Sequence, residues 1–254
     1  MSARPPAGSD PADVSAGFDA AAEHYDLLVR LNPGYHKHLR MSACRLHLQA
    51  SPRPRLLDLG CGTGASTAAL LRVHPRAEVV GVDASGGMVA AARAKPWPPG
   101  VRFVHARAED LSTALHREGI EPGFDGVLAA YLVRNVADRD GVLAAVRDLL
   151  APGGRLVVHE YSVADSGWAR ARWRVVCHGV VVPLAWAVSR DTTLYRYLER
   201  SVLAFDGVGA FENRLRRAGF TGVRALPATG WQRGIVHSFV ATAPGSGTQA
   251  GPAA

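Results

Sequence analysis

Lysine is almost absent from this chain of 254 residues: Lys37 and Lys95 are the only two, and every other basic side chain is an arginine. The formal net charge is still +7, and the isoelectric point is about 9.8. The arginines are scattered among alanines, which points to coding bias, and no basic stripe is interleaved with aromatic residues. The cluster Arg214-Leu215-Arg216-Arg217 has the spacing of a solvated helix face. Nucleic acid is therefore not an expected partner.

Cysteine is also scarce, and the three that occur lack the spacing of a metal site or of a disulfide framework. Cys44, Cys61 and Cys177 are far apart and form no C-x-x-C pair. This pattern fits a reducing cytoplasm. The histidines near the N-terminus have no accompanying acidic pattern, so we expect no metal and assign core or solvated positions to His24, His36 and His38.

Long apolar runs are missing as well. The N-terminal residues include prolines and small side chains but no apolar segment of a secretory signal. The most apolar stretch, Trp168 to Val188, is interrupted by polar, glycine and proline positions, and a spanning helix needs roughly 20 apolar residues. We expect a cytoplasmic protein with a single domain over residues 13–243 and disordered tails at 1–12 and 244–254.

A glycine-rich loop after a buried strand is the most informative feature that is present. Arg55 to Leu59 is an apolar run too short for a helix, and Gly60, Gly62 and Gly64 follow at alternate positions. Such glycines let the backbone approach a ligand, and the helix beginning at Ala65 turns free N–H groups toward it. The loop also fits a plain turn or the G-x-G-x-x-G/A dinucleotide pattern. It resembles the first motif of class I S-adenosylmethionine (SAM) methyltransferases.

Acidic residues at two strand ends favour the SAM interpretation. Asp58 precedes the first glycine by two positions, where a carboxylate can face a cationic amino-acid moiety. Asp83 ends the next strand, where its carboxylate can accept both ribose hydroxyls. The resemblance to class I methyltransferases implies that the next loop cups the adenine, usually with an acid or amide where this chain has Arg107. Backbone groups around Ala108, or Glu109, are alternative contacts. The predicted cofactor-binding residues are Asp58, Gly60, Gly62, Gly64, Thr67, Asp83, Arg107, Ala108 and Ala130.

Alternating strand and helix signals define the expected fold class. Strands are expected at 55–59, 78–83, 101–105, 124–130, 155–159, 221–226 and 235–243. Five strand–helix units joined by short turns predict a parallel sheet with helices on both faces. The closeness of the last two strands suggests an antiparallel final strand. The result is an α/β, Rossmann-like doubly wound seven-stranded sheet in the methyltransferase order 3-2-1-4-5-7-6, with N-terminal helices at 12–31 and 36–49 and a helical insertion after strand five.

Several further stretches resemble the ubiquinone/menaquinone biosynthesis C-methyltransferase family. They are Arg134-Asn135-Val136 with Asp138, Leu150 to Leu156, Glu160-Tyr161-Ser162, Phe18 to Asp26 and Tyr195 to Ser201. The likeness spans about residues 14–243. The chain departs from the family's pattern at Val163 and Ala164, where lysine and proline are usual, and in the stretch 229–237, which is usually rich in glycine. These departures fall where the acceptor is expected, so the acceptor can differ from a standard demethylmenaquinone.

The resemblance implies a SAM-dependent C-methyltransferase acting on an electron-rich aromatic ring, in particular a prenylated, demethylmenaquinone-like quinol. Arg134 is the expected catalytic residue, stabilising a phenolate or orienting a water, and Asn135 would fix ring hydroxyls. The alternative for Arg134 is an ion pair with an acid such as Asp138 that holds the loop. Three other functions remain open: methyl transfer to another small phenolic or lipid acceptor, nicotinamide-dependent oxidation, and a non-catalytic SAM-binding subunit.

The expected partners follow from this assignment. The acceptor is an apolar small molecule, a quinol or phenol. The apolar 175–186 part of the insertion has three interpretations: a wall of the acceptor pocket, a peripheral contact with the inner face of a membrane, and ordinary core packing. A homo-oligomer is left open.

Overall fold

The computed structural model describes residues 34–48, 51–183, 186 and 193–245. Its strands are β1 (Arg55–Leu59), β2 (Glu78–Asp83), β3 (Val101–His105), β4 (Phe124–Ala130), β5 (Leu150–Tyr161), β6 (Thr221–Pro227) and β7 (Val236–Thr242). They form one seven-stranded sheet in the order β3-β2-β1-β4-β5-β7-β6. Neighbours among β1 to β5 are parallel, and β7 is antiparallel to both β5 and β6. The predicted fold class, strand order and antiparallel last strand are confirmed.

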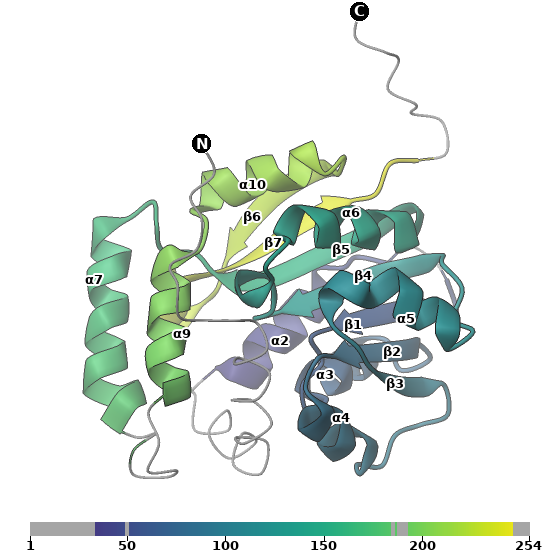
Figure 1. Ribbon diagram of the computed structural model, residues 1–254. Coiled ribbons are helices and arrows are strands. Elements are labelled where there is room, and N and C mark those ends of the chain that lie inside the picture. The colour runs from purple at the N-terminus through teal and green to yellow at the C-terminus, as the bar shows by residue number, and fades with distance from the viewer. Residues whose placement is uncertain (1–33, 49–50, 184–185, 187–192, 246–254) are drawn as a thin grey trace, which may run out of the picture.

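Helices cover both faces of the sheet (Figure 1). They are α2 (Tyr35–Cys44), α3 (Ala65–Val73), α4 (Gly86–Arg93), α5 (Leu111–Arg117), α6 (Arg139–Leu149), α7 (Gly167–Val176), α9 (Thr193–Ala204) and α10 (Val208–Arg217), with short segments η1 (Ala108–Asp110), η2 (Val133–Asn135), η3 (Cys177–Val181) and η4 (Gly230–Gln232). Helices α5, α6 and α10 pack on one face, and α2, α3 and α4 pack on the other. The helix predicted at 12–31 lies outside the described residues.

The alternation of side chains along the central strands explains this layering. Successive residues of a strand point to opposite faces of the sheet. Leu57 and Leu59 of β1 therefore join the core beneath α5 and α6, while Leu56 joins the core beneath α2 and α3. Asp58 shares the face of Leu56 and His159 that of Val157, so both polar side chains point toward the α2 and α3 layer.

Two element boundaries differ from the sequence-based prediction. Strand β5 begins at Leu150 instead of Arg155, because Leu150 pairs with Phe124 before the register shifts, and Gly153 takes a φ of 76° inside the strand. The stretch Pro152-Gly153-Gly154 therefore forms an irregularity within β5. Helix α2 ends at Cys44 and not near residue 49, since His47 adopts a φ of 45°, which no α-helix can continue.

The insertion after β5 forms a helical layer beside the sheet (Figure 1). Ala169, Trp173 and Cys177 point inward from α7 and η3 and are buried in one cluster with Tyr161. Their spacing of four residues is that of one helix face. None of the helices within the described ranges is both long and apolar enough to cross a membrane.

Candidate functional site

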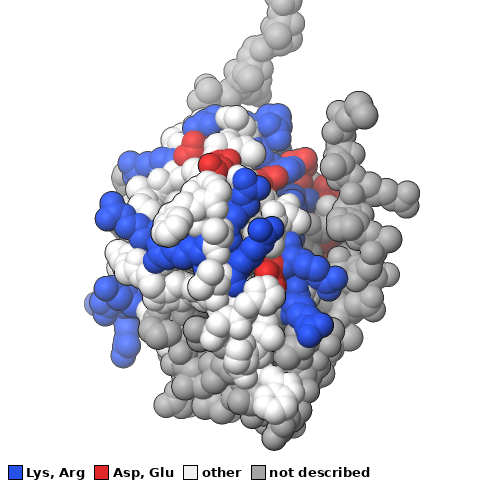
Figure 2. Space-filling model, turned by 90° about the vertical axis from the view of Figure 1, so that its left-hand side faces the viewer, with Lys and Arg blue, Asp and Glu red and all other residues white. Residues whose placement is uncertain are grey.

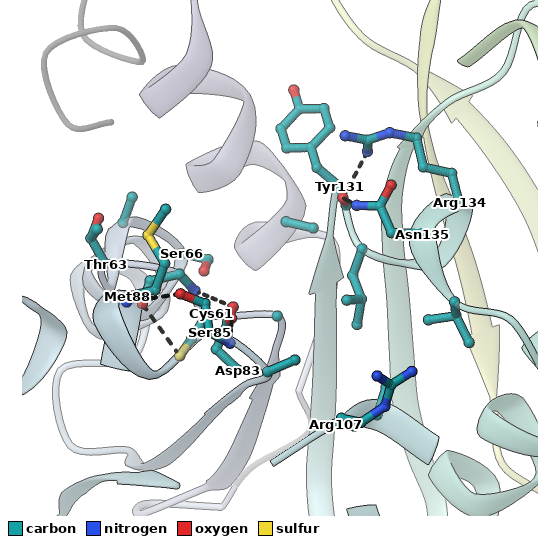
Figure 3. Close-up of a pocket in the computed structure, with 18 of the residues that line it drawn as sticks. Cys61, Thr63, Ser66, Asp83, Ser85, Met88, Arg107, Tyr131, Arg134 and Asn135 are labelled. Atoms are coloured by element: carbon teal, nitrogen blue, oxygen red, sulfur yellow. Dashed lines mark hydrogen bonds between the residues drawn. The ribbon is translucent and has the colours of Figure 1, made fainter. Parts of the chain in front are cut away.

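A cavity opens at the carboxyl ends of β1, β2 and β4, the edge where parallel sheets present ligand-binding groups (Figure 3). Eight of the predicted site residues line it: Gly60, Gly62, Asp83, Arg107, Ala108, Ala130, Arg134 and Asn135. Three others are not part of its wall: Asp58, Gly64 and Thr67. One continuous site thus contains the cofactor residues at strand ends β1 and β2 and the proposed catalytic residues after β4.

Asp83 is the acidic group of the cofactor half. Its Oδ2 accepts a hydrogen bond from the Gly62 N–H over 2.8 Å, and its Oδ1 accepts one from the Ser85 N–H over 2.9 Å. Burial raises the pKa of this carboxyl, and the two N–H donors oppose that effect. Ser85 also caps α4 by accepting from the Met88 N–H. The carboxylate is therefore held in a fixed orientation with lone pairs left for a ligand.

The three loop glycines are required for different reasons. All three have positive φ angles, of 77°, 52° and 92° at Gly60, Gly62 and Gly64. A Cβ at Gly60 would lie 2.9 Å from Leu132, and one at Gly64 would lie 2.6 Å from Trp97, so both are restricted by the protein itself. A Cβ at Gly62 would meet nothing within 4 Å, and this glycine lines the cavity. Gly62 is thus the position where a ligand can approach the backbone.

Asp58 lies beneath the loop instead of in the wall. Its side chain is fully buried, and its Oδ2 accepts hydrogen bonds from Ser66 Oγ and Thr67 Oγ1 over 2.8 and 2.6 Å. Its Oδ1 has no hydrogen-bond partner among the described residues. Burial raises the pKa of Asp58 to about 6, against the effect of the two hydroxyls. A cation close to Oδ1 would complete this site, and Thr67 serves it by orienting the carboxylate.

Arg107 occupies the opposite end of the cofactor half (Figure 3). Its Nε lies 3.6 Å from Glu109 Oε2, and its side chain is 40% exposed. Glu109 also accepts a hydrogen bond from the Ala137 N–H over 3.2 Å. Arg107 can therefore donate to ring nitrogens of an adenine but cannot accept from its amino group. Glu109, which also lines the cavity, offers an acceptor.

The second half of the cavity is formed by the segment after β4. Tyr131 has a φ of 57°, which is uncommon for a residue other than glycine. Its carbonyl accepts hydrogen bonds from Arg134 Nη1 over 2.7 Å and from Asn135 Nδ2 over 3.4 Å (Figure 3). Tyr197 of α9 donates from its hydroxyl to Asn135 Oδ1 over 3.2 Å. The tight turn at Tyr131 thus places both predicted catalytic side chains beside an aromatic ring.

Arg134 forms an ion pair, but its partner is not Asp138. The Arg134 side chain is 6% exposed, and its Nη1 lies 2.7 Å from Oε1 of Glu160, whose side chain is fully buried. Asp138 instead caps α6 through the Gly141 N–H. The guanidinium also lies 5.5 Å from the centre of the Tyr161 ring. Arg134 is therefore fixed at the cavity wall and charge-compensated from β5.

Sequence reasoning missed the aromatic part of this half. Tyr35 and Tyr131 both line the cavity, with stacked rings whose centres are 5.7 Å apart. Tyr161 lies 5.2 Å from Tyr131 and 4.7 Å from Trp173 of α7. The available signal was the segment Tyr131-Leu132-Val133, which lies between the predicted strand 124–130 and Arg134. The rings of Tyr35 and Tyr131, which line the cavity, suit a flat, apolar ligand ring.

Comparison with known proteins assigns this arrangement to a family. A sequence model of the ubiE/COQ5 methyltransferase family matches residues 7–242. The chain belongs to this family. It is therefore a SAM-dependent methyltransferase, as predicted, and the nicotinamide-dependent alternative is set aside.

Individual relatives agree over nearly the whole chain. The Syntrophotalea carbinolica protein named ubiquinone/menaquinone biosynthesis C-methyltransferase UbiE is 36% identical over 89% of this chain and 92% of its own length. The Thermus thermophilus demethylmenaquinone methyltransferase is 38% identical over 80% of this chain and 91% of its own. Among solved structures, the [4+2]-cyclase SpnF aligns with a TM-score of 0.65, 16% identity and coverage of 95% and 98% of the two chains, which shows the fold alone.

The residues of the cavity fit the family's cofactor. Asp58 Oδ1 is buried beneath the glycine loop without a partner among the described residues, as a site for a cationic group requires. Gly62 leaves open space at the wall, and the Asp83 carboxylate faces the same cavity. The described residues contain no group of three His, Cys, Asp or Glu side chains placed to hold a metal ion.

Proposed function

We propose that the protein transfers the methyl group of SAM to a ring carbon of a reduced, prenylated quinone precursor of the demethylmenaquinone type. Family membership over residues 7–242 supports the reaction, and the printed names of the relatives support the acceptor. The observation that carries the proposal is one cavity with Asp83 at one end and Tyr35, Tyr131 and Arg134 at the other. Its first half suits a nucleoside, and its second suits an electron-rich ring.

Different residues would bind the cofactor and activate the acceptor in this reaction. Asp83 would accept hydrogen bonds from ribose hydroxyls, and Asp58 would pair with the amino-acid end of the cofactor. The bound sulfonium supplies an already activated methyl group, so the protein needs only to align and activate the acceptor carbon. Arg134, with its charge fixed in a water-poor wall, would favour the ionised phenol, which is the more nucleophilic form. The methyl replaces a ring hydrogen, which leaves as a proton.

The experiment that tests this function is a comparison of quinones from cells with and without the protein. Mass spectrometry should show a quinone lighter by one methyl group accumulating when the protein is missing. An unchanged quinone profile would contradict the proposed acceptor. If another phenol or a lipid accumulates instead, that compound is the acceptor. The departures from the family's pattern at Val163 and Ala164 would then reflect this different acceptor.

We also propose that the protein docks on the inner, cytoplasmic face of an anionic membrane through α7. Trp168 and Val175 are seven residues apart on α7 and are 77% and 71% exposed, and Trp186 further along is 54% exposed. Arg170 and Arg174 are exposed beside them. Figure 2 shows this face, where basic side chains are widely spread and acidic ones are few. Exposed tryptophan beside arginine is the pattern of a helix that lies in a lipid interface.

Acidic residues are absent from the whole docking segment. No Asp or Glu occurs in residues 167–186. The inner side of the same helix holds Trp173, which contacts Tyr161 next to the cavity wall. A lipid-dissolved acceptor would therefore reach the protein close to the aromatic half of the cavity.

A further inference from the structure

The strained backbone of Tyr131 is held on both sides by hydrogen bonds. Its N–H donates to the His159 carbonyl over 2.7 Å, and its carbonyl accepts from Arg134 Nη1 over 2.7 Å. Its ring stacks on Tyr35 at an interplanar angle of 13°. A positive φ at a bulky residue persists only when its surroundings determine it, and such positions concentrate at functional sites. The ring and hydroxyl of Tyr131 are thus fixed in place at the cavity wall.

A buried imidazole lies directly behind this hydroxyl. The Tyr131 hydroxyl is 3.1 Å from His159 Nε2, and the two rings meet edge to face. His159 is fully buried, and burial lowers its pKa to about 3, so the imidazole is neutral at physiological pH. A neutral imidazole has one N–H donor and one acceptor nitrogen. Which nitrogen carries the proton decides whether Tyr131 accepts from the ring or donates to it.

The groups around Nδ1 of His159 favour one of the two tautomers. Ser42 Oγ and Ser238 Oγ each lie 3.0 Å from Nδ1 and 2.9 Å from each other. Arg45 Nη1 lies 2.7 Å from Ser238 Oγ, and a guanidinium can only donate. The Ser238 oxygen therefore accepts from Arg45, and the nearby guanidinium charge polarises the Ser238 hydroxyl into a stronger donor. This favours Nδ1 as the acceptor of a hydrogen bond, given by Ser238 directly or through Ser42. With Nδ1 as the acceptor, the imidazole proton lies on Nε2.

With the proton on Nε2, the hydrogen bonds run in one direction, from Arg45 through Ser238 and His159 to the Tyr131 oxygen. The hydroxyl proton of Tyr131 is then turned toward an acceptor other than His159. Hydrogen bonds in such a chain polarise one another, so the terminal hydroxyl becomes a stronger donor.

We propose that Tyr131 is a catalytic hydrogen-bond donor to the phenolate oxygen of the methyl acceptor, and that Arg45, Ser238 and His159 are positioning residues that aim and polarise its hydroxyl. The proposal rests on the phenolic acceptor of the proposed function. Tyr131 keeps its proton throughout, and His159 takes none up. By stabilising the phenolate, the hydroxyl raises the fraction of acceptor that is ionised at neutral pH. It complements Arg134, whose guanidinium lies 6.0 Å from the centre of the Tyr131 ring.

The pH dependence of turnover tests the role of Tyr131. In anaerobic assays with a reduced prenylated quinone, Tyr131→Phe should shift the acid limb of kcat upward by about one pH unit, a roughly tenfold loss at neutral pH that is regained at higher pH. The KM for SAM should stay unchanged. The matched control is Tyr161→Phe, whose ring lies 5.2 Å from Tyr131 but outside the lining of the cavity. It should keep the wild-type profile. A Tyr131→Phe profile that superimposes on wild type overturns the proposal.

A measurement without any acceptor tests the positioning residues independently. In ¹⁵N-histidine spectra of the whole protein, the resonances lost in His159→Gln identify the imidazole of His159. They should show a neutral ring with its proton on Nε2 from pH 8 down to pH 6. A proton on Nδ1, or a charged ring, would contradict the proposed role of His159 in orienting the Tyr131 hydroxyl. If the wild-type protein methylates no hydroquinone although Nε2 carries the proton, the proposed function is wrong. The hydrogen-bond chain from Arg45 to Tyr131 is then still supported.

Discussion

The buried ion pair of Arg134 changes what its removal should do. Arg134 and Glu160 are almost completely buried and 2.7 Å apart. Arg134→Ala leaves an unpaired buried carboxylate, which costs about 3–5 kcal/mol in similar cases. We therefore expect this variant to lose stability as well as methyl transfer. Urea unfolding beside an activity assay would show both losses.

A paired substitution separates the two roles of Arg134. In Arg134→Met with Glu160→Gln, no buried charge remains, and the free energy of unfolding should return to near the wild-type value. The methyl-transfer rate should stay roughly 10²–10³-fold lower, as when one transition-state donor is removed. Asn135→Ala should act in the same direction but more weakly. If activity returns together with stability, Arg134 is structural.

His159 should make stability depend on pH in the acid range. Its pKa is about 3 in the folded protein and 6.5 in the unfolded chain. Below pH 6.5 the unfolded chain binds a proton that the folded protein does not, so stability falls as pH falls from 6.5 toward 3. Between pH 7 and pH 5 this group should remove about 2 kcal/mol. Urea titrations of wild type and His159→Gln should show that difference, and equal pH slopes would contradict it.

Asp83 should contribute directly to cofactor affinity. Its carboxylate lines the cavity, and removing it leaves ribose hydroxyls without an acceptor. Asp83→Ala should weaken SAM binding by about 1–3 kcal/mol in calorimetry. Asp110→Ala is the control, because this exposed acid of η1 lies outside the cavity lining. Equal affinities of wild type and Asp83→Ala would refute the assignment.

The two acids show how far the site could be predicted from the sequence. Asp83 ends its strand, and a terminal side chain faces the crevice in any doubly wound sheet, so its place followed from the pattern. Asp58 lies inside β1, where its direction depends on the pleat and on the Ser66 and Thr67 hydroxyls of α3. Tyr131 needed a three-dimensional contact with His159, which is 28 positions away. Motifs locate strand ends, but long-range hydrogen bonds appear only in the structure.

At the scale of elements, the outer face of α7 is expected to bind anionic vesicles at low salt. Each arginine near a charged bilayer contributes about 1 kcal/mol, and buried tryptophan adds to this. Arg170→Glu with Arg174→Glu should lower vesicle binding at least about tenfold, and Trp168→Ser with Val175→Ser should lower it independently of salt. Sedimentation with phosphatidylglycerol vesicles measures both effects.

The control for this surface is a charge reversal elsewhere on the protein. Arg117→Glu on α5 changes an exposed arginine on the side of the sheet opposite α7 (Figure 1). It should leave vesicle binding unchanged apart from the small effect of net charge. Binding reduced equally by all variants would indicate non-specific attraction, and wild-type protein that stays in the supernatant would contradict the docking surface.

Elements were predictable where local signals agree. The bounds of β1, β2, β3 and β4 match the apolar runs, because each run ends at a glycine, an acid or a turn. Strand β5 was placed five residues late, since Pro152 and Gly153 usually stop a strand, yet pairing of Leu150 with Phe124 extends the sheet past them. The turn preference of Pro152 and Gly153 is thus outweighed by strand pairing within the sheet.

For the whole molecule, the strand order explains why the two halves of the site meet. Strand β1 lies between β2 and β4 at the centre of the sheet, so the glycine loop, Asp83 and Tyr131 share one edge. The fold and cofactor could be predicted from motif order and spacing. The residues that line the acceptor half could not all be predicted, because this half combines α2, η2 and the end of β4.

The central claim is carbon methylation of a reduced prenylated quinone, and deuterated SAM tests it most directly. The purified protein is incubated anaerobically with CD₃-labelled SAM and the reduced acceptor, and the product is then oxidised in air and analysed by mass spectrometry. A ring-methylated product keeps both hydroxyls, so we predict a labelled species that returns to the quinone form. A labelled product that cannot be oxidised to a quinone would show methylation on oxygen, and that result, or the absence of label, would contradict the account.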